Sequence, residues 1–141
     1  MDFKYIESVE DARKVFPILK ELRTHLDEGE YLKGLAAARA GSDYKFVGAF
    51  EGAECLGLMG YRILHDFVHG RHLYVDDLVV TGNKRSKGLG SKFLTFAKEI
   101  AAKENCKRLR LCTGADNNEG RKFYEKNGWE MKAVVYKSII S

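Results

Sequence analysis

The pattern of apolar and polar residues along the first third of the chain predicts a short strand and two helices. Residues 3–6 alternate as a strand does. Ser8, followed three residues later by Asp11, indicates a helix N-terminus, and apolar side chains then recur at helical spacing through residues 12–26. A second helix is expected over residues 27–40, closed by a glycine and a serine.

Pro17 falls inside the first of these helices. Proline removes a backbone donor and clashes with the preceding turn, at a cost of about 3 kcal/mol if nothing relieves it. We therefore expect the helix to bend or restart near Pro17.

From residue 44 onward the same patterns predict five strands and two helices. The first two strands form a hairpin with a turn at Glu51 and Gly52. A later strand, helix and strand follow one another as they do in a unit with parallel neighbours. Strands are expected over residues 44–50, 54–64, 72–80, 108–113 and 129–140, and helices over residues 88–105 and 117–126. The fold class is mixed, α/β (α+β).

The length and composition agree with one globular domain over residues 1–141. A chain of 141 residues with 45% hydrophobic residues can bury a single core. No apolar run reaches the roughly 18 residues of a membrane span, and the N-terminus lacks the apolar core of a signal peptide, so a cytoplasmic location and no membrane partner are expected. A net charge of +4 is too mild to indicate nucleic acid.

Cysteine and histidine do not predict a disulfide or metal site. The three cysteines are odd in number, and no pair has the two-residue spacing of a zinc or redox motif. His65, His69 and His72 lie around a hairpin, but their irregular spacing favours an exposed turn over a metal site.

A basic, glycine-containing loop lies between a predicted strand and a predicted amphipathic helix. The amides that open a helix lack intrahelical acceptors and attract phosphate. Gly88 and Gly90 allow close backbone approach, while Lys84, Arg85 and Lys87 supply positive charge. The loop lacks the Gly-Lys-Ser/Thr ending of a triphosphate P-loop and the Gly-x-Gly-x-x-Gly of a dinucleotide site. These features suit a cofactor that carries a diphosphate.

The Arg-x-x-Gly-x-Gly sequence after a strand ending Asp-Asp-Leu-Val-Val resembles the coenzyme A-binding motif of the GNAT N-acetyltransferase superfamily. The resemblance extends to the order of most elements, and it implies a mixed, mostly antiparallel sheet splayed between its fourth and fifth strands, with helices on both faces. It also implies acetyl-CoA as the acetyl donor. The implied contacts are main-chain groups of Leu78, Val79 and Val80 along pantetheine, and Arg85, Ser86, Lys87, Gly88, Leu89, Gly90 and Ser91 around the pyrophosphate.

Asn117 precedes Tyr124 by seven residues, as in the second signature of the same superfamily. The resemblance implies a cofactor-arm contact for Asn117 and a general-acid role for Tyr124, whose phenol is protonated at neutral pH. The motif strand also resembles that of the spermidine/spermine acetyltransferases, in which the residue matching Asp76 serves the acceptor amine. Side chains alternate along a strand, so Asp76 and Asp77 are expected on opposite faces, with Asp76 as a base, direct or through water. Asp76 is equally well interpreted as a substrate-binding carboxylate, and Asp77 as a structural one.

The acceptor is expected to bind where the first two helices meet, near Glu28 and Tyr31, with Asp77 as a further contact. The hypothesis is direct transfer of acetyl from acetyl-CoA to a primary amine of a small molecule in a ternary complex. Polyamines, aminoalkylphosphonates, amino acid derivatives and antibiotics are candidate acceptors. A protein or peptide acceptor, and a non-catalytic acyl-CoA sensor, remain as alternatives. Pairing of the exposed last strand with that of a second copy would give a homodimer.

Overall fold

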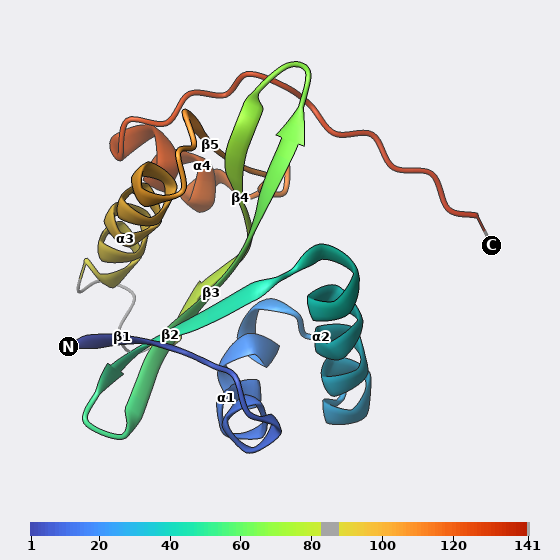
Figure 1. Cartoon of the computed structure of the whole chain (residues 1–141), viewed down its shortest axis with the longest axis vertical. Helices are drawn as coiled ribbons and strands as arrows, with labels where there is room; N and C mark the ends of the chain where they lie inside the picture. The colour runs from blue at the N-terminus through green and yellow to red at the C-terminus, as the bar shows by residue number, and fades with distance from the viewer. Residues whose placement is uncertain (83–87, 141) are drawn as a thin grey trace. The chain divides into compact units, whose positions relative to one another are not determined.

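The computed structural model describes residues 1–82 and 88–140 (Figure 1). The chain forms two compact units, Met1–Arg110 and Leu111–Ser141, each of which is described by itself. Among the described residues, no helix combines the length and apolar character that a membrane span requires.

A mixed sheet of five strands forms the centre of the first unit, in the order β1-β2-β3-β4-β5. The β1–β2, β2–β3 and β3–β4 pairs are antiparallel, and β4 and β5 are parallel, which confirms the predicted fold class. The β2–β3 turn contains Gly52 at a φ of 60°, a left-handed conformation that glycine adopts without strain. The strands are β1 Asp2–Tyr5, β2 Lys45–Glu51, β3 Glu54–Asp66, β4 Gly70–Val80 and β5 Arg108–Leu111.

The lengths of β4 and β5 differ: β4 has eleven residues and β5 has four. The amide of Lys107, just before β5, donates to the carbonyl of Arg71 near the start of β4. Since the two strands are parallel and rise at similar rates, β5 can accompany only the first half of β4. The end of β4 therefore extends past β5, as a splayed sheet requires.

The helices begin where the capping signals predict. The Ser8 hydroxyl accepts from the amide of Asp11 at 3.0 Å, and α1 then continues through Pro17 without a break. Asp27 and Glu30 form a reciprocal capping box at the start of α2. The helices are α1 Val9–Leu22, α2 Glu28–Ser42, α3 Leu89–Lys103 and α4 Asn118–Lys126, the last of these in the second unit.

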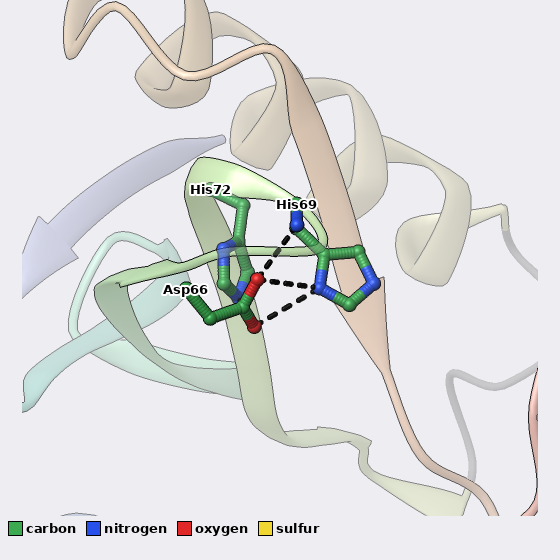
Figure 2. A group of neighbouring side chains, drawn as sticks. All are labelled: Asp66, His69 and His72. Atoms are coloured by element: carbon green, nitrogen blue, oxygen red, sulfur yellow. Dashed lines mark hydrogen bonds and ion pairs between the residues drawn. The ribbon is translucent and has the colours of Figure 1, made fainter.

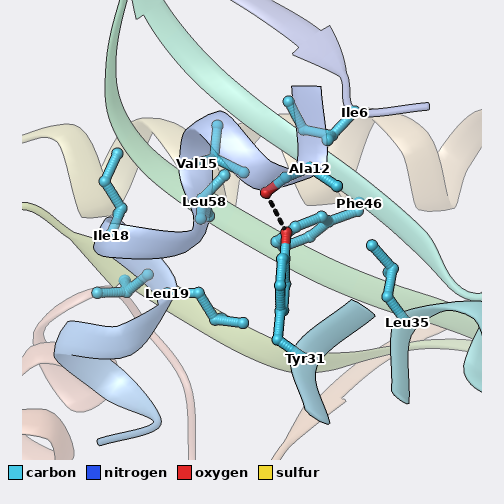
Figure 3. Close-up of a cluster of buried hydrophobic side chains, with 10 residues drawn as sticks. Ile6, Ala12, Val15, Ile18, Leu19, Tyr31, Leu35, Phe46 and Leu58 are labelled. Carbon is cyan, nitrogen blue, oxygen red and sulfur yellow. Dashed lines mark hydrogen bonds between the residues drawn. The ribbon is translucent and has the colours of Figure 1, made fainter. Parts of the chain in front are cut away.

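Helices cover both faces of the sheet in the first unit, as predicted. On one face, α1 and α2 pack on β2, β3 and β4 through a cluster that includes Phe46 and Leu58, shown in Figure 3. On the other face, the fully buried ring of Phe93 from α3 contacts Phe3 of β1, with ring centroids 5.2 Å apart. The sheet is thereby sandwiched, and its motif strand β4 is held between two layers.

The predicted strand over residues 129–140 is wrong: these residues carry no regular secondary structure. From Met131 onward their apolar side chains are exposed, with Tyr136 at 91% and Ile140 at 95%. The amides and carbonyls of a strand need a neighbouring strand as partner. Past Leu111, the described residues of the second unit contain no strand that could provide one.

Candidate functional site

A β-bulge interrupts the pairing of β3 with β4 at the two acidic residues of the motif strand. Gly60 pairs with Asp77, whereas the next residue, Tyr61, pairs with Val75, so Asp76 is an extra residue on β4. An extra residue breaks the strict alternation of side chains and re-aims the local ones. The expectation that Asp76 and Asp77 face opposite sides is therefore wrong: both line the same hollow.

Both carboxylates are bound by arginines. Arg62 binds Asp76 with two bonds, from Nε to Oδ2 and from Nη2 to Oδ1, each 2.8 Å long. Arg23 donates from Nε to Asp77 Oδ1 at 2.9 Å and from Nη2 to the main-chain oxygen of Asp76 at 2.9 Å. The Tyr44 hydroxyl donates to the remaining Asp77 oxygen at 2.7 Å. Bidentate, charge-assisted bonds of this kind fix both the position and the plane of a carboxylate.

These groups surround a hollow of about 390 Å³ on the face of the sheet that α1 and α2 cover. The charged side chains that line it are two arginines and two aspartates, so its lining carries no formal net charge. A ligand there meets fixed donors and fixed acceptors within one small space. The lining residues are Arg23, Ala38, Ser42, Tyr44, Arg62, Asp76 and Asp77.

Tyr44 can approach the sheet closely because the residue it lies against, Gly60, has no side chain. A Cβ at Gly60 would overlap the hydroxyl and ring of Tyr44, so glycine is required for this approach. Burial, followed by the charge of Asp77, raises the pKa of Tyr44 well above its ordinary value. The phenol therefore remains a hydrogen-bond donor throughout the physiological range.

Sequence reasoning did not find Arg23, Tyr44 or Arg62. Arg23 lies 54 residues from Asp77 in the chain, and Tyr44 lies 33 residues from it. No local spacing can indicate partners at such separations. Arg62 and Asp76 belong to the two arms of one hairpin, so pairing the predicted strands in register was the one signal that could have suggested that ion pair.

Two residues predicted to contact the acceptor, Glu28 and Tyr31, do not line this hollow. Tyr31 is a core residue, 4% exposed, and its hydroxyl donates to the carbonyl of Ala12 at 2.7 Å (Figure 3). Glu28 is half exposed and pairs with Arg13 at 3.5 Å. Neither of them lines the hollow, because the first turn of α2 packs against α1 rather than over β4.

The expected pyrophosphate loop is described only in part, because Arg85, Ser86 and Lys87 lie outside the described residues. Gly88 caps α3 at a φ of 75°, with no side-chain hydrogen bond at the cap. The amide of Lys92 donates to the carbonyl of Gly88 at 3.2 Å. By the geometry of an α-helix, the amides of Leu89, Gly90 and Ser91 open the helix and have no acceptor within it.

Of the described residues, none crowds the backbone at the start of α3. None of them would come within 4 Å of a Cβ at Gly88, and Gly90 has no side chain. The side chain of Leu89 is buried in the core, so only its amide can serve an anion. Ser91 lines a separate hollow of about 310 Å³ beside Phe96. This arrangement fits the diphosphate of a coenzyme.

The end of β4 and its predicted contacts fit an extended arm of a ligand. Val79 turns its side chain into the core and pairs with Leu58, while Leu78 and Val80 are half buried. At this level the edge of β4 that faces away from β3 extends beyond the end of β5. Main-chain contacts of these residues with pantetheine stay a prediction.

In the second unit, Asn117 caps α4. Its Oδ1 accepts from the amide of Gly120 at 3.0 Å, and its Nδ2 donates to Thr113 Oγ1 at 3.0 Å. Tyr124 lies seven residues later, about two helical turns along α4, and contacts the ring of Trp129 at a centroid distance of 6.0 Å. Burial raises the pKa of Tyr124 above its ordinary value of about 10. A phenol in this state can give a proton to a leaving group.

Comparison with known proteins supports one family. A sequence model described as the acetyltransferase (GNAT) family matches residues 7–129. An uncharacterized N-acetyltransferase, YhdJ, of Bacillus subtilis (strain 168) is 30% identical over 138 residues, covering 97% of each chain. A thialysine N-epsilon-acetyltransferase of Mus musculus is 25% identical over 91 residues, covering 58% of this chain and 54% of that protein. A transcriptional regulator from Bacillus halodurans C-125 shares the fold, with a TM-score of 0.85 at 16% identity over 99% of each chain.

Proposed function

Because the chain belongs to the GNAT family of acetyltransferases and is an acetyl-CoA-dependent N-acetyltransferase, we propose that its acceptor is a small primary amine that also carries an anionic group. The observation that carries this proposal is the hollow at the β4 bulge, in which two aspartates are each paired with an arginine. Because that lining carries two positive and two negative side chains, it favours some of the candidate acceptors over others.

A polyamine would gain little in this hollow. Of the described residues that line it, the two carboxylates already accept charge-assisted bonds from Arg62 and Arg23. A polycation would compete with these guanidinium groups and be repelled by them. A molecule with one ammonium and one carboxylate or phosphonate brings a partner for each sign, so the two ion pairs and the ligand can form a network of six charges. Thialysine, named for the murine relative, has two ammonium groups and one carboxylate, so it also brings a partner for each sign.

In the proposed reaction, the neutral amine nitrogen of the acceptor attacks the thioester carbonyl carbon of acetyl-CoA in a ternary complex. A carbon–nitrogen bond forms, the carbon–sulfur bond breaks, and the thiolate of coenzyme A takes a proton from Tyr124. The amine proton leaves through a water bound at Asp76, whose carboxylate Arg62 holds in place. Acid and base partners of this kind typically contribute about 10²- to 10⁴-fold each.

The remaining assignments concern binding of acetyl-CoA. The amides that open α3, from Gly88 to Ser91, would receive the pyrophosphate together with Arg85, Ser86 and Lys87. Main-chain groups of Leu78 to Val80 would follow the pantetheine, and Asn117 would contact the arm. Support for these roles comes from the uncapped start of α3 and from the family's motif.

An acceptor panel tests the substrate class. Thiol release from acetyl-CoA is measured with thialysine, lysine, an aminoalkylphosphonate, spermidine and a short peptide. We expect kcat/KM for the amines that carry an anion to exceed that for spermidine at least tenfold. A preference for spermidine, or for the peptide, would refute the proposal. Coenzyme binding without turnover on the whole panel would instead support an acyl-CoA sensor.

Arg62→Gln supplies a sharper test, because it leaves Asp76 without its bidentate partner. We expect the ratio of kcat/KM for spermidine to kcat/KM for an amine that carries an anionic group to rise at least tenfold. Arg71→Gln is the matched control, since Arg71 lies on the same hairpin and binds the exposed Glu104. An equal change of that ratio in both variants would contradict the role of Arg62.

Tyr124→Phe tests the general acid. We expect kcat to fall by about 10²-fold or more, with the KM for acetyl-CoA within about twofold, because the phenol acts in the chemical step. Tyr136→Phe, at a 91% exposed tyrosine of the same unit, should leave kcat unchanged. Retention of full kcat by Tyr124→Phe would remove Tyr124 from the mechanism.

A further inference from the structure

The turn between β3 and β4 brings together three potential metal ligands that the sequence did not connect. One ligand atom from each of Asp66, His69 and His72 lies within 4.8 Å of the other two (Figure 2). The expectation of an exposed histidine-bearing turn holds for His65, but His72 is completely buried. The fold, rather than the spacing, therefore creates this cluster.

The hairpin geometry positions Asp66 and His69. The register ends with Asp66 opposite Gly70, and Gly70 has a φ of 63°, which suits glycine in a short hairpin loop. The Asp66 carboxylate accepts from the amide of His69 at 2.6 Å and contacts His69 Nδ1 at 3.0 Å with each of its oxygens. Figure 2 shows the carboxylate facing this ring, with His72 beside it.

The buried ring of His72 is already oriented as a ligand. Its Nδ1 lies 2.8 Å from the carbonyl of Gly70, which can only accept, so Nδ1 carries the ring proton. Nε2 therefore carries a lone pair, and Asp66 Oδ2 lies 4.0 Å from this nitrogen. Histidines that bind metal commonly donate the N–H of the other ring nitrogen to a backbone carbonyl, as His72 does here.

Arg110 of β5 occupies the position that a cation would take. Its Nη1 lies 3.2 Å from His72 Nε2 and 3.8 Å from Asp66 Oδ2. The side chain is 34% exposed, and its guanidinium also lies over the ring of Tyr74 at 5.2 Å. It can thus turn toward solvent without leaving a buried charge. The cluster attracts a cation, and the resident cation is displaceable.

We propose that Asp66, His69 and His72 bind a divalent transition-metal ion of the zinc class after Arg110 withdraws. The ligands are a carboxylate oxygen of Asp66, Nδ1 of His69 and Nε2 of His72, with water in a fourth position. Two imidazoles and a carboxylate favour Zn²⁺ or Co²⁺ over Mg²⁺ and Ca²⁺. Ligand atoms around zinc lie about 3.3 Å apart, so the widest separation in the cluster must shrink by up to about 1.5 Å, which the partly exposed His69 on the turn can supply.

Metal binding at this place would clamp the β3–β4 hairpin at its end. His72 precedes Asp76 on β4 by four residues, so the clamp acts on the strand that carries the bulge without belonging to the acceptor hollow. The site is independent of the proposed acceptor, and its test does not use acetyl transfer.

The experiment is a titration of the full chain, freed of metal by a chelator, with Zn²⁺ in a calorimeter and with Co²⁺ by visible absorption. We expect one ion per chain and the absorption bands of tetrahedral Co²⁺. His69→Ala should weaken binding at least tenfold, while His65→Ala, at an exposed histidine of the same hairpin, should bind as the wild type does. Arg110→Gln should bind at least tenfold more tightly, because no cation must be displaced.

Three results would overturn the proposal. The first is the absence of stoichiometric binding in both the wild type and Arg110→Gln. The second is unchanged binding in His69→Ala, which would direct attention to the cysteine thiols. The third is weaker binding in Arg110→Gln, which would make Arg110 a supporting residue and not a displaceable one. Since none of these variants alters the buried His72, each variant is expected to fold.

Discussion

Replacing Tyr44 with phenylalanine removes a single hydroxyl from the floor of the hollow. That hydroxyl donates to Asp77 Oδ2 at 2.7 Å, and Asp77 is only 17% exposed. The ring keeps its carbon contacts over Gly60 and near Phe46, with ring centroids of Tyr44 and Phe46 5.8 Å apart, although the hydroxyl is the atom that lies closest to Gly60. Tyr44→Phe is therefore a clean deletion of one charge-assisted hydrogen bond.

The size of the effect follows from what Asp77 retains. A hydrogen bond to a charged group contributes about 1.5–3 kcal/mol. The other oxygen of Asp77 keeps its bonds to Arg23, so the carboxylate is not left without a partner, and we expect the lower end of that range. The free energy of unfolding should fall by about 1.5–2 kcal/mol, which is about 5–8 °C in Tm for a chain of this length.

Urea and thermal denaturation followed by circular dichroism measure this change. The slope of the unfolding free energy against urea should stay the same, because the area exposed on unfolding does not change. Tyr136→Phe is the matched control and should not alter Tm, since Tyr136 is 91% exposed. A loss below about 0.5 kcal/mol for Tyr44→Phe would refute the reasoning, because the bond to Asp77 would then have no net value.

Three further changes have expected outcomes. Gly60→Ala should lower the free energy of unfolding by about 1–3 kcal/mol in urea denaturation, because the new methyl group displaces Tyr44. Ser8→Ala should lower Tm through loss of the α1 cap, worth about 1 kcal/mol. Tyr31→Phe should cost about 1 kcal/mol at pH 7 through loss of the bond to Ala12. Burial raises the pKa of Tyr31 from 10.0 to about 12, so its contribution is complete below pH 10 and is lost as the pH rises through 12. The gap between wild type and Tyr31→Phe should therefore shrink in alkaline melts, and a constant gap would contradict the assigned core role.

Much of the fold could be predicted because its determinants are local. The Ser8 cap, the helix that starts at Asp27 and the turn at Gly52 each depend on residues within a few positions of one another. The periodicity of apolar residues placed four helices and five strands close to their observed bounds. The last predicted strand failed because periodicity reports the faces of a segment but not the presence of a partner for its backbone.

By itself, the sequence determined the donor half of the chemistry, through a family motif contained in one strand, one loop and one helix start. Only the tertiary structure brought together the residues on which the proposed acceptor site rests. The bulge opposite Gly60 turns Asp76 and Asp77 to the same side, and Arg23 and Arg62 pair with them across 54 and 14 residues of chain. A bulge is a property of two strands in register, and an ion pair is a property of side chains in space. Neither can be read from the spacing of residues along one segment.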